Sequence, residues 1–161
     1  MKILIAYATR FGTTEKCAGM LAEILKEKGN EVKLMDLKKN KSVKIQNDLV
    51  VVGGSFVAFR MNAIVKRFVK RNLDTLLNMK TGIFMCGADE DWEKEIKKGF
   101  PEELLDKAVA KGYFGFEMNW DKMNPMVRNI MQKAWKTTEP VSKINIENIR
   151  KFAEEIAEAL P

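Results

Sequence analysis

The sequence contains no histidine and only two cysteines, Cys17 and Cys86. The lack of histidine excludes Ser-His-Asp and Cys-His catalysis, histidine-ligated metal sites and acid–base chemistry by an imidazole. Two cysteines without histidine also argue against a structural zinc site, and we expect both to be buried thiols rather than a disulfide. Any chemistry that this chain performs is therefore expected to come from a bound cofactor.

Long apolar runs are missing as well. No uninterrupted run approaches the ~20 residues that cross a membrane, and the apolar stretch Ile3 to Ala8 is too short for a signal peptide. We therefore expect a cytoplasmic protein. The chain has 161 residues, of which 46% are hydrophobic and 31% are charged, as is ordinary for a globular domain. We expect residues 1–161 to form a single domain.

The charge balance is basic, with 28 lysines and arginines against 22 acidic residues and a net charge of +6. This excess fits either a solvated lysine-rich surface or a surface that attracts an acidic partner, an anionic membrane or a nucleic acid. No C-x-x-C pair, RNA-binding aromatic strand or long arginine tract is present, so we expect no nucleic-acid binding.

The order of secondary structure can be predicted from hydrophobic periodicity. Strands are expected at 2–8, 31–37, 48–54, 81–86 and 111–117, and helices at 13–29, 61–77, 101–110, 123–136 and 145–160. Such alternation indicates an α/β fold with a parallel sheet and helices on both faces. Five strands in a chain of this length suit the doubly wound strand order 2-1-3-4-5.

Ligands in such a sheet bind beyond the carboxyl ends of the strands, where residues 9–14, 55–60 and 87–92 should meet. The first loop offers the hydroxyls of Thr9, Thr13 and Thr14, together with Gly12 and the N-terminus of a helix. These groups suit a phosphate monoester, although they also fit a plain loop with a threonine cap. The patterns G-x-G-x-x-G and G-x-x-x-x-G-K-S/T are absent, which disfavours a dinucleotide or a nucleoside triphosphate.

The second and third loops contain aromatic residues. Phe56 and Phe59 follow a buried strand, and Trp92 lies just beyond Gly87, where the backbone could approach a flat ring closely. A planar ligand would cover these side chains, but they could equally pack against neighbouring helices. Cys86 closes a predicted core strand and is interpreted as an inert thiol.

The segment Met123 to Lys136 predicts an amphipathic helix with a methionine-rich apolar stripe flanked by basic residues. Such a helix can lie on a membrane or dock on a partner. The alternative is that the stripe covers the sheet edge or the last strand.

The opening K-I-L-I-A-Y-A-T-R-F-G-T-T-E-K resembles the first strand and phosphate loop of the flavodoxin-like family. The family pattern S/T-x-x-G-x-T falls on Thr9, Gly12 and Thr14, and the strand end V-V-V-G-G-S is similar too. The resemblance covers nearly the whole chain. It implies a three-layer sandwich that binds flavin mononucleotide (FMN) non-covalently, with no catalytic side chain.

The resemblance also implies which residues contact the cofactor. The phosphate would lie on the first loop and the isoalloxazine ring between the other two. The implied contacts are Thr9, Arg10, Phe11, Gly12, Thr13, Thr14, Ser55, Phe56, Val57, Gly87 and Trp92.

Within this family, the T-R-x-G-x-T form with Arg10, the stretch G-G-S-F and the stretch F-V-K-R-N look most like the quinone-dependent protoporphyrinogen oxidases. The leading hypothesis is an FMN protein that passes electrons to a redox partner protein or a quinone. A second hypothesis is a menaquinone-linked protoporphyrinogen dehydrogenase with an anionic substrate, in contact with a membrane surface through 123–136. A third is a flavin-free interaction module on the same fold.

Overall fold

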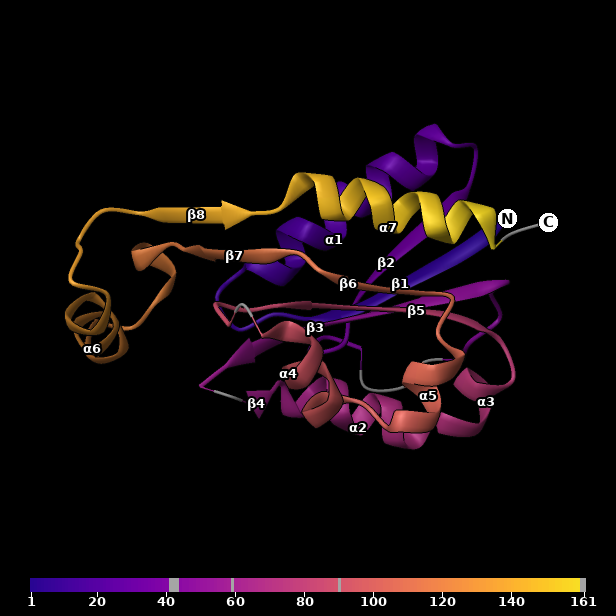
Figure 1. Cartoon of the computed structure of the whole chain (residues 1–161), viewed down its shortest axis with the longest axis horizontal. Helices are drawn as coiled ribbons and strands as arrows, with labels where there is room; N and C mark the ends of the chain where they lie inside the picture. Colours follow the sequence, from indigo (N-terminus) through magenta and orange to yellow (C-terminus); the bar gives the residue numbers. More distant parts are fainter. Residues whose placement is uncertain (41–43, 59, 90, 160–161) are drawn as a thin grey trace.

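The structure, a computed structural model, describes residues 1–40, 44–58, 60–89 and 91–159. Its centre is a sheet in which five parallel strands lie in the order β2-β1-β3-β5-β6 (Figure 1). Their bounds are Lys2–Ala8 for β1, Glu31–Asp36 for β2, Leu49–Val57 for β3, Lys80–Cys86 for β5 and Ala110–Tyr113 for β6. Counted along the chain, these parallel strands have the predicted order 2-1-3-4-5.

Helices cover both faces of the sheet, as Figure 1 shows. On one face lie α1 (Thr13–Glu27) and α7 (Ile146–Glu158), and on the other lie α2 (Ala63–Arg71), α3 (Leu73–Leu77), α4 (Trp92–Gly99) and α5 (Glu102–Lys107). Alternate residues of β1 serve the two faces: Ile3 packs in the layer of α1 and α7, and Leu4 in the layer of α2 to α5. The three-layer sandwich is therefore confirmed.

The helix expected at 61–77 is divided. Met61 belongs to the two-residue strand β4 (Arg60–Met61), which pairs antiparallel with the end of β3. Asn62 then caps α2, because its side chain accepts a hydrogen bond from the Ile64 N–H at 3.0 Å. Asn72 ends α2 by donating its side-chain amide to the Phe68 carbonyl at 2.8 Å. The two asparagines mark boundaries that the apolar periodicity does not show.

The strand expected at 111–117 was wrong, because two strands occupy this stretch. The chain turns at Gly115, whose φ of 79° suits glycine, and a Cβ there would lie 2.0 Å from the Lys143 carbonyl oxygen. Strand β7 (Gly115–Met118) therefore leaves the main sheet and pairs antiparallel with β8 (Val141–Ile144).

Residues 115–144, here called the excursion, extend beyond one end of the main sheet (Figure 1). Between β7 and β8 they form a short 3-10 turn, η1 (Trp120–Lys122), and helix α6 (Pro125–Trp135). A small core of their own holds them together, formed by Phe116, Met118, Trp120 and Met123 with partly buried Val127, Met131, Val141 and Phe11.

The stripe of α6 contributes Val127 and Met131 to this small core, which also contains Phe116 and Met118 of β7. It therefore covers, in part, the end of the last strand expected at 111–117, as one of the two alternatives predicted. Met126 and Ile130 remain 71% and 60% exposed. Across the described chain, no helix combines the length and apolar character that crossing a membrane requires. The last helix was expected to reach Leu160, which lies outside the described residues.

Candidate functional site

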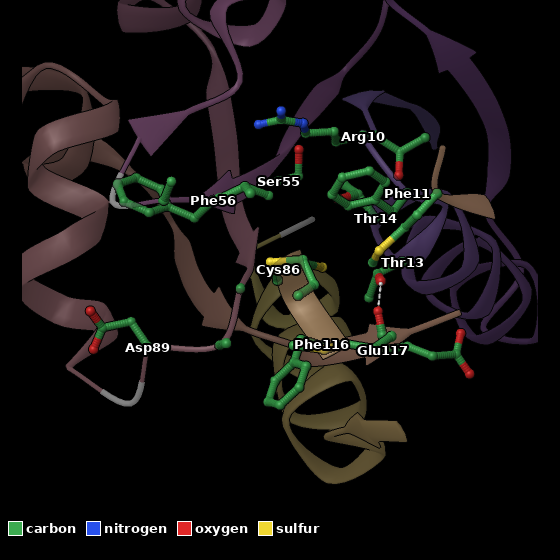
Figure 2. A pocket seen from close by; sticks show the side chains of 18 of the residues that line it. Arg10, Phe11, Thr13, Thr14, Ser55, Phe56, Cys86, Asp89, Phe116 and Glu117 are labelled. Carbon is green, nitrogen blue, oxygen red and sulfur yellow. Dashed lines mark hydrogen bonds between the residues drawn. The ribbon is translucent and has the colours of Figure 1, made fainter. Parts of the chain in front are cut away.

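The carboxyl ends of β1, β3 and β5 open into a cavity of about 500 Å³, here called the main cavity (Figure 2). All three predicted loops contribute to it. Its lining consists of Thr9, Arg10, Phe11, Thr13, Thr14, Ser55, Phe56, Val57, Ala58, Cys86, Gly87, Ala88, Asp89, Phe116, Glu117, Met118, Met123, Met131 and Trp135. Nine of the eleven sequence-predicted contact residues are in this set; Gly12 and Trp92 are not.

The first loop is shaped by Thr9 and Gly12. The Gly12 N–H donates to the Thr9 hydroxyl oxygen at 2.8 Å, and Gly12 has a φ of 96°, which only glycine adopts without strain. This turn delivers the N-terminus of α1 to the cavity wall. Gly12 therefore shapes the loop from outside the lining.

Thr13 and Thr14 differ sharply in their hydrogen bonding. The Thr13 hydroxyl donates to the Glu117 carbonyl at 3.0 Å, the bond drawn in Figure 2. The Thr14 side chain is fully buried, and its oxygen makes no hydrogen bond of ordinary geometry with any residue that the structure describes. It interacts only weakly with the Cys86 thiol. A buried hydroxyl without a partner costs free energy, and a hydrogen bond to a ligand atom would remove this cost.

Arg10 and Phe11 form the outer part of the same loop. The Arg10 guanidinium lies 5.3 Å from the centre of the Phe11 ring, a distance at which a cation and an aromatic face attract each other. Phe11 in turn packs against the small core of the excursion. The loop thus presents a positive charge at the mouth of the cavity.

The second loop provides the wall on the β3 side. Ser55 and Phe56 are 8% and 6% exposed. Phe56 packs in the core and also lines the cavity, so its contact with a planar ligand stays a prediction. Asn62 donates its side-chain amide to the Ser55 hydroxyl at 3.4 Å. Phe59 lies outside the described residues.

The third loop begins with Gly87, which is fixed from two sides. Its N–H donates to the Gly115 carbonyl at 3.0 Å, and its carbonyl accepts from the Tyr113 hydroxyl at 2.7 Å. A Cβ on Gly87 would lie 2.9 Å from the Phe56 carbonyl oxygen. Glycine is therefore needed for the close approach of the second and third loops.

Trp92 is not among the residues that line the main cavity, so its contact with a flavin ring stays a prediction without support from the cavity geometry. It occupies the first turn of α4, and its ring lies parallel to that of Tyr113, with centres 6.4 Å apart and planes 13° apart. The Trp92 ring thus stacks against Tyr113, a side chain of β6. Asp89 lines the cavity in its place.

The wall contributed by the excursion was not foreseen. Phe116, Met118, Met123, Met131 and Trp135 make it apolar, and the Phe116 and Trp135 rings lie 5.2 Å apart. The amphipathic pattern of 123–136 was the only sequence signal, and it could not show that the segment returns over the first loop.

Burial controls the ionisation of Cys86 and Tyr7. Desolvation, with a smaller effect from the neighbouring Cys17 thiol, raises the pKa of Cys86 well above its usual value. Both cysteines are buried and free, as predicted. Desolvation and then the charges of Glu15 and Asp36 raise the pKa of Tyr7 to about 12. Both Cys86 and Tyr7 are therefore neutral at pH 7, and Cys86 is poorly suited to act as a nucleophile.

The residues present fit FMN. A phosphate would satisfy the Thr14 hydroxyl and the free amides in the first turn of α1. The apolar walls around Phe56 and Phe116 suit a planar ring. In the described part of the chain, no cluster of potential metal ligands occurs.

Solved structures of other proteins are similar to this fold. Flavodoxin 1 from Bacillus cereus is 15% identical, with a TM-score of 0.60 and full coverage of both chains. A short-chain flavodoxin associated with a non-canonical PDU bacterial microcompartment is 16% identical, with a TM-score of 0.64, covering 100% of this chain and 99% of that one. Rubredoxin oxygen:oxidoreductase from Desulfovibrio gigas is 20% identical, with a TM-score of 0.59, covering 99% of this chain and 36% of that one.

These structural similarities show the fold alone. In a comparison of sequences, no curated protein matches the chain significantly. Residues 4–145, however, match a family described as a flavodoxin domain. Because this match spans most of the chain, the protein belongs to the flavodoxin domain family, whose members bind FMN.

Proposed function

We propose that this protein binds one FMN in the main cavity and transfers electrons to a redox partner. One observation supports this most strongly: the Thr14 hydroxyl is fully buried without an ordinary hydrogen bond in the described chain. It lies at the N-terminus of α1, in the wall of a cavity that is apolar on the sides of Phe56 and Phe116. FMN, whose phosphate is joined to a planar ring by a ribityl chain, matches both parts of this site.

The chain's own residues bind and orient the cofactor. The first loop holds the phosphate through Thr9, Thr14 and the amides of α1, as helix N-termini do. Ser55 to Val57 and Gly87 flank the ring, and Phe56 excludes water from one side of it. Bound FMN supplies the electron-carrying chemistry. The Cys86 thiol, which also lines the cavity, remains protonated and takes no part in this chemistry.

The partner is proposed to be acidic. The net charge of +6 attracts an acidic surface and speeds the encounter at low salt. Salt screens this attraction, since the screening length falls to about 8 Å at physiological ionic strength.

The test loads the chain with FMN, reduces it chemically and mixes it with an acidic and a basic cytochrome of matched potential. We expect faster electron transfer to the acidic cytochrome, slowed by salt. Failure to reduce either cytochrome would contradict an electron-transfer role. Equal rates at all salt concentrations would contradict the acidic partner alone.

A second candidate is an oxidoreductase for a carboxylate-bearing small molecule with a quinone as acceptor. It is favoured by a second cavity of about 520 Å³ that shares Arg10, Ser55 and Val57 with the main one and adds Arg60. Within the described chain, neither arginine makes an ion pair. Oxidation of a porphyrinogen by the FMN-loaded protein with added menaquinone would support this candidate, and no turnover would exclude it.

A further inference from the structure

Lys122, a residue of the excursion, lies over the first loop. Its Nζ, Cδ and Cε atoms lie 2.6, 3.1 and 3.4 Å from the point where a Cβ on Gly12 would be. The lysine side chain therefore occupies the space that glycine leaves open at the N-terminus of α1. Lys122 and Gly12 are far apart in the sequence, and only the return of the excursion brings them together.

The excursion is fastened to the first turns of α1. Thr13 donates its hydroxyl to the Glu117 carbonyl at 3.0 Å, and Lys16 forms an ion pair with the Glu117 carboxylate at 2.8 Å. The η1 turn is held by Trp120, which is 5% exposed and donates its indole N–H to the Glu139 carbonyl at 2.7 Å. The backbone that carries Lys122 is therefore positioned by several independent contacts.

The charge on Lys122 has no counterpart in the described chain, where the acidic partners in ion pairs belong to other lysines. A helix N-terminus has positive potential, so the solvent-exposed ammonium group of Lys122 and the helix end would both be stabilised by an anion bound there. The unpartnered Thr14 hydroxyl, fully buried in the same first turn, independently indicates a ligand with hydrogen-bond acceptors. Both observations are satisfied by a phosphate.

We propose that Lys122 is a phosphate ligand, whose ammonium group neutralises part of the charge of the FMN phosphate. This inference rests on the proposed function, since FMN provides the phosphate. The excursion would then contribute to the site in two ways. Lys122 contacts the phosphate, and Phe116 and Trp135 line the main cavity.

The test compares Lys122→Met with a matched control, Lys133→Met, which removes an exposed charge from α6 of the same excursion. Dissociation constants for FMN and for riboflavin, which lacks the phosphate, are measured by quenching of flavin fluorescence. We expect Lys122→Met to weaken FMN binding roughly tenfold, as befits the loss of a bond to a charged group. Riboflavin binding should stay unchanged, and Lys122→Arg should keep most of the affinity for FMN.

Three results would overturn the proposal. Unchanged FMN affinity in Lys122→Met would show that the lysine makes no contact. Equal losses for FMN and riboflavin would show a structural role. A tenfold loss in Lys133→Met would show a general effect of surface charge.

Inorganic phosphate separates this inference from the proposed function. If the unaltered protein binds neither flavin, the proposed function fails, and protection against thermal unfolding by phosphate then becomes the measurement. Protection that disappears in Lys122→Met would still support a phosphate site containing Lys122. No protection of the unaltered protein would overturn it.

Discussion

Replacing Thr14 by valine should make the flavin-free protein more stable and at the same time weaken its binding of FMN. Valine has nearly the same shape but lacks the hydroxyl, which is buried and unpartnered in the described structure. Leaving such a group unsatisfied costs about 1–3 kcal/mol. In the absence of flavin, Thr14→Val should therefore raise the free energy of unfolding by about 1–2 kcal/mol.

The same change should weaken FMN binding. A hydrogen bond to a charged phosphate contributes about 1.5–3 kcal/mol, which corresponds to a loss of roughly ten- to a hundredfold in affinity. Urea unfolding of the flavin-free protein, followed by circular dichroism, measures the first effect, and titration with FMN measures the second.

Thr13→Val is the matched control, because the Thr13 hydroxyl already donates to the Glu117 carbonyl at 3.0 Å. This variant should lose about 1 kcal/mol of stability. If Thr14→Val lowered stability as Thr13→Val does and left FMN affinity unchanged, the Thr14 hydroxyl would be neither unsatisfied in the flavin-free protein nor bonded to the phosphate.

Three other predictions follow from burial and exposure. Gly53→Ala should cost about 3 kcal/mol or more in urea unfolding, because its Cβ would lie 2.0 Å from the Phe84 ring in the core; a cost below about 1 kcal/mol would contradict this packing. The pKa of Tyr7 rises from 10.0 to about 12 on folding, so the folded state holds the phenol proton more tightly. The free energy of unfolding should therefore fall as the pH rises from about 10 to about 12. Tyr7→Phe should show a smaller fall. Because Met126 and Ile130 are exposed beside basic side chains, we expect the protein to sediment with anionic vesicles; a protein that stays in the supernatant contradicts membrane contact.

Two controls sharpen these measurements. Gly19→Ala in α1 meets no atom within 4 Å and should stabilise the protein by about 0.5–1 kcal/mol, in contrast to Gly53→Ala. The double variant Met126→Ser, Ile130→Ser should no longer sediment with vesicles. Its folding stability should change by less than about 0.5 kcal/mol, as is usual for exposed positions.

Much of the fold could be predicted because buried parallel strands leave a strong local signal. Strand β1 has the bounds predicted for it, and the glycines at the end of β3 lie where the second loop begins. The meeting of the three loops then follows from parallel topology alone. It could therefore be predicted from the sequence that Thr14 and Ser55 line the cavity.

The rest depends on contacts between distant segments. The pairing of β7 with β8 spans the whole excursion, and neither strand shows by its own pattern where its partner is. Trp92 could face the cavity or the core, and the position of the Tyr113 ring decides this. Lys122 is one of many lysines until the fold brings it to Gly12.

FMN binding is tested most directly by a visible absorption spectrum of the purified protein after excess FMN has been added and the unbound flavin removed. We expect retained flavin absorbance at one FMN per chain, and reduced retention in Thr14→Val. A folded protein that retains no FMN would contradict the assignment of the first loop to phosphate, and with it the proposed electron-transfer role.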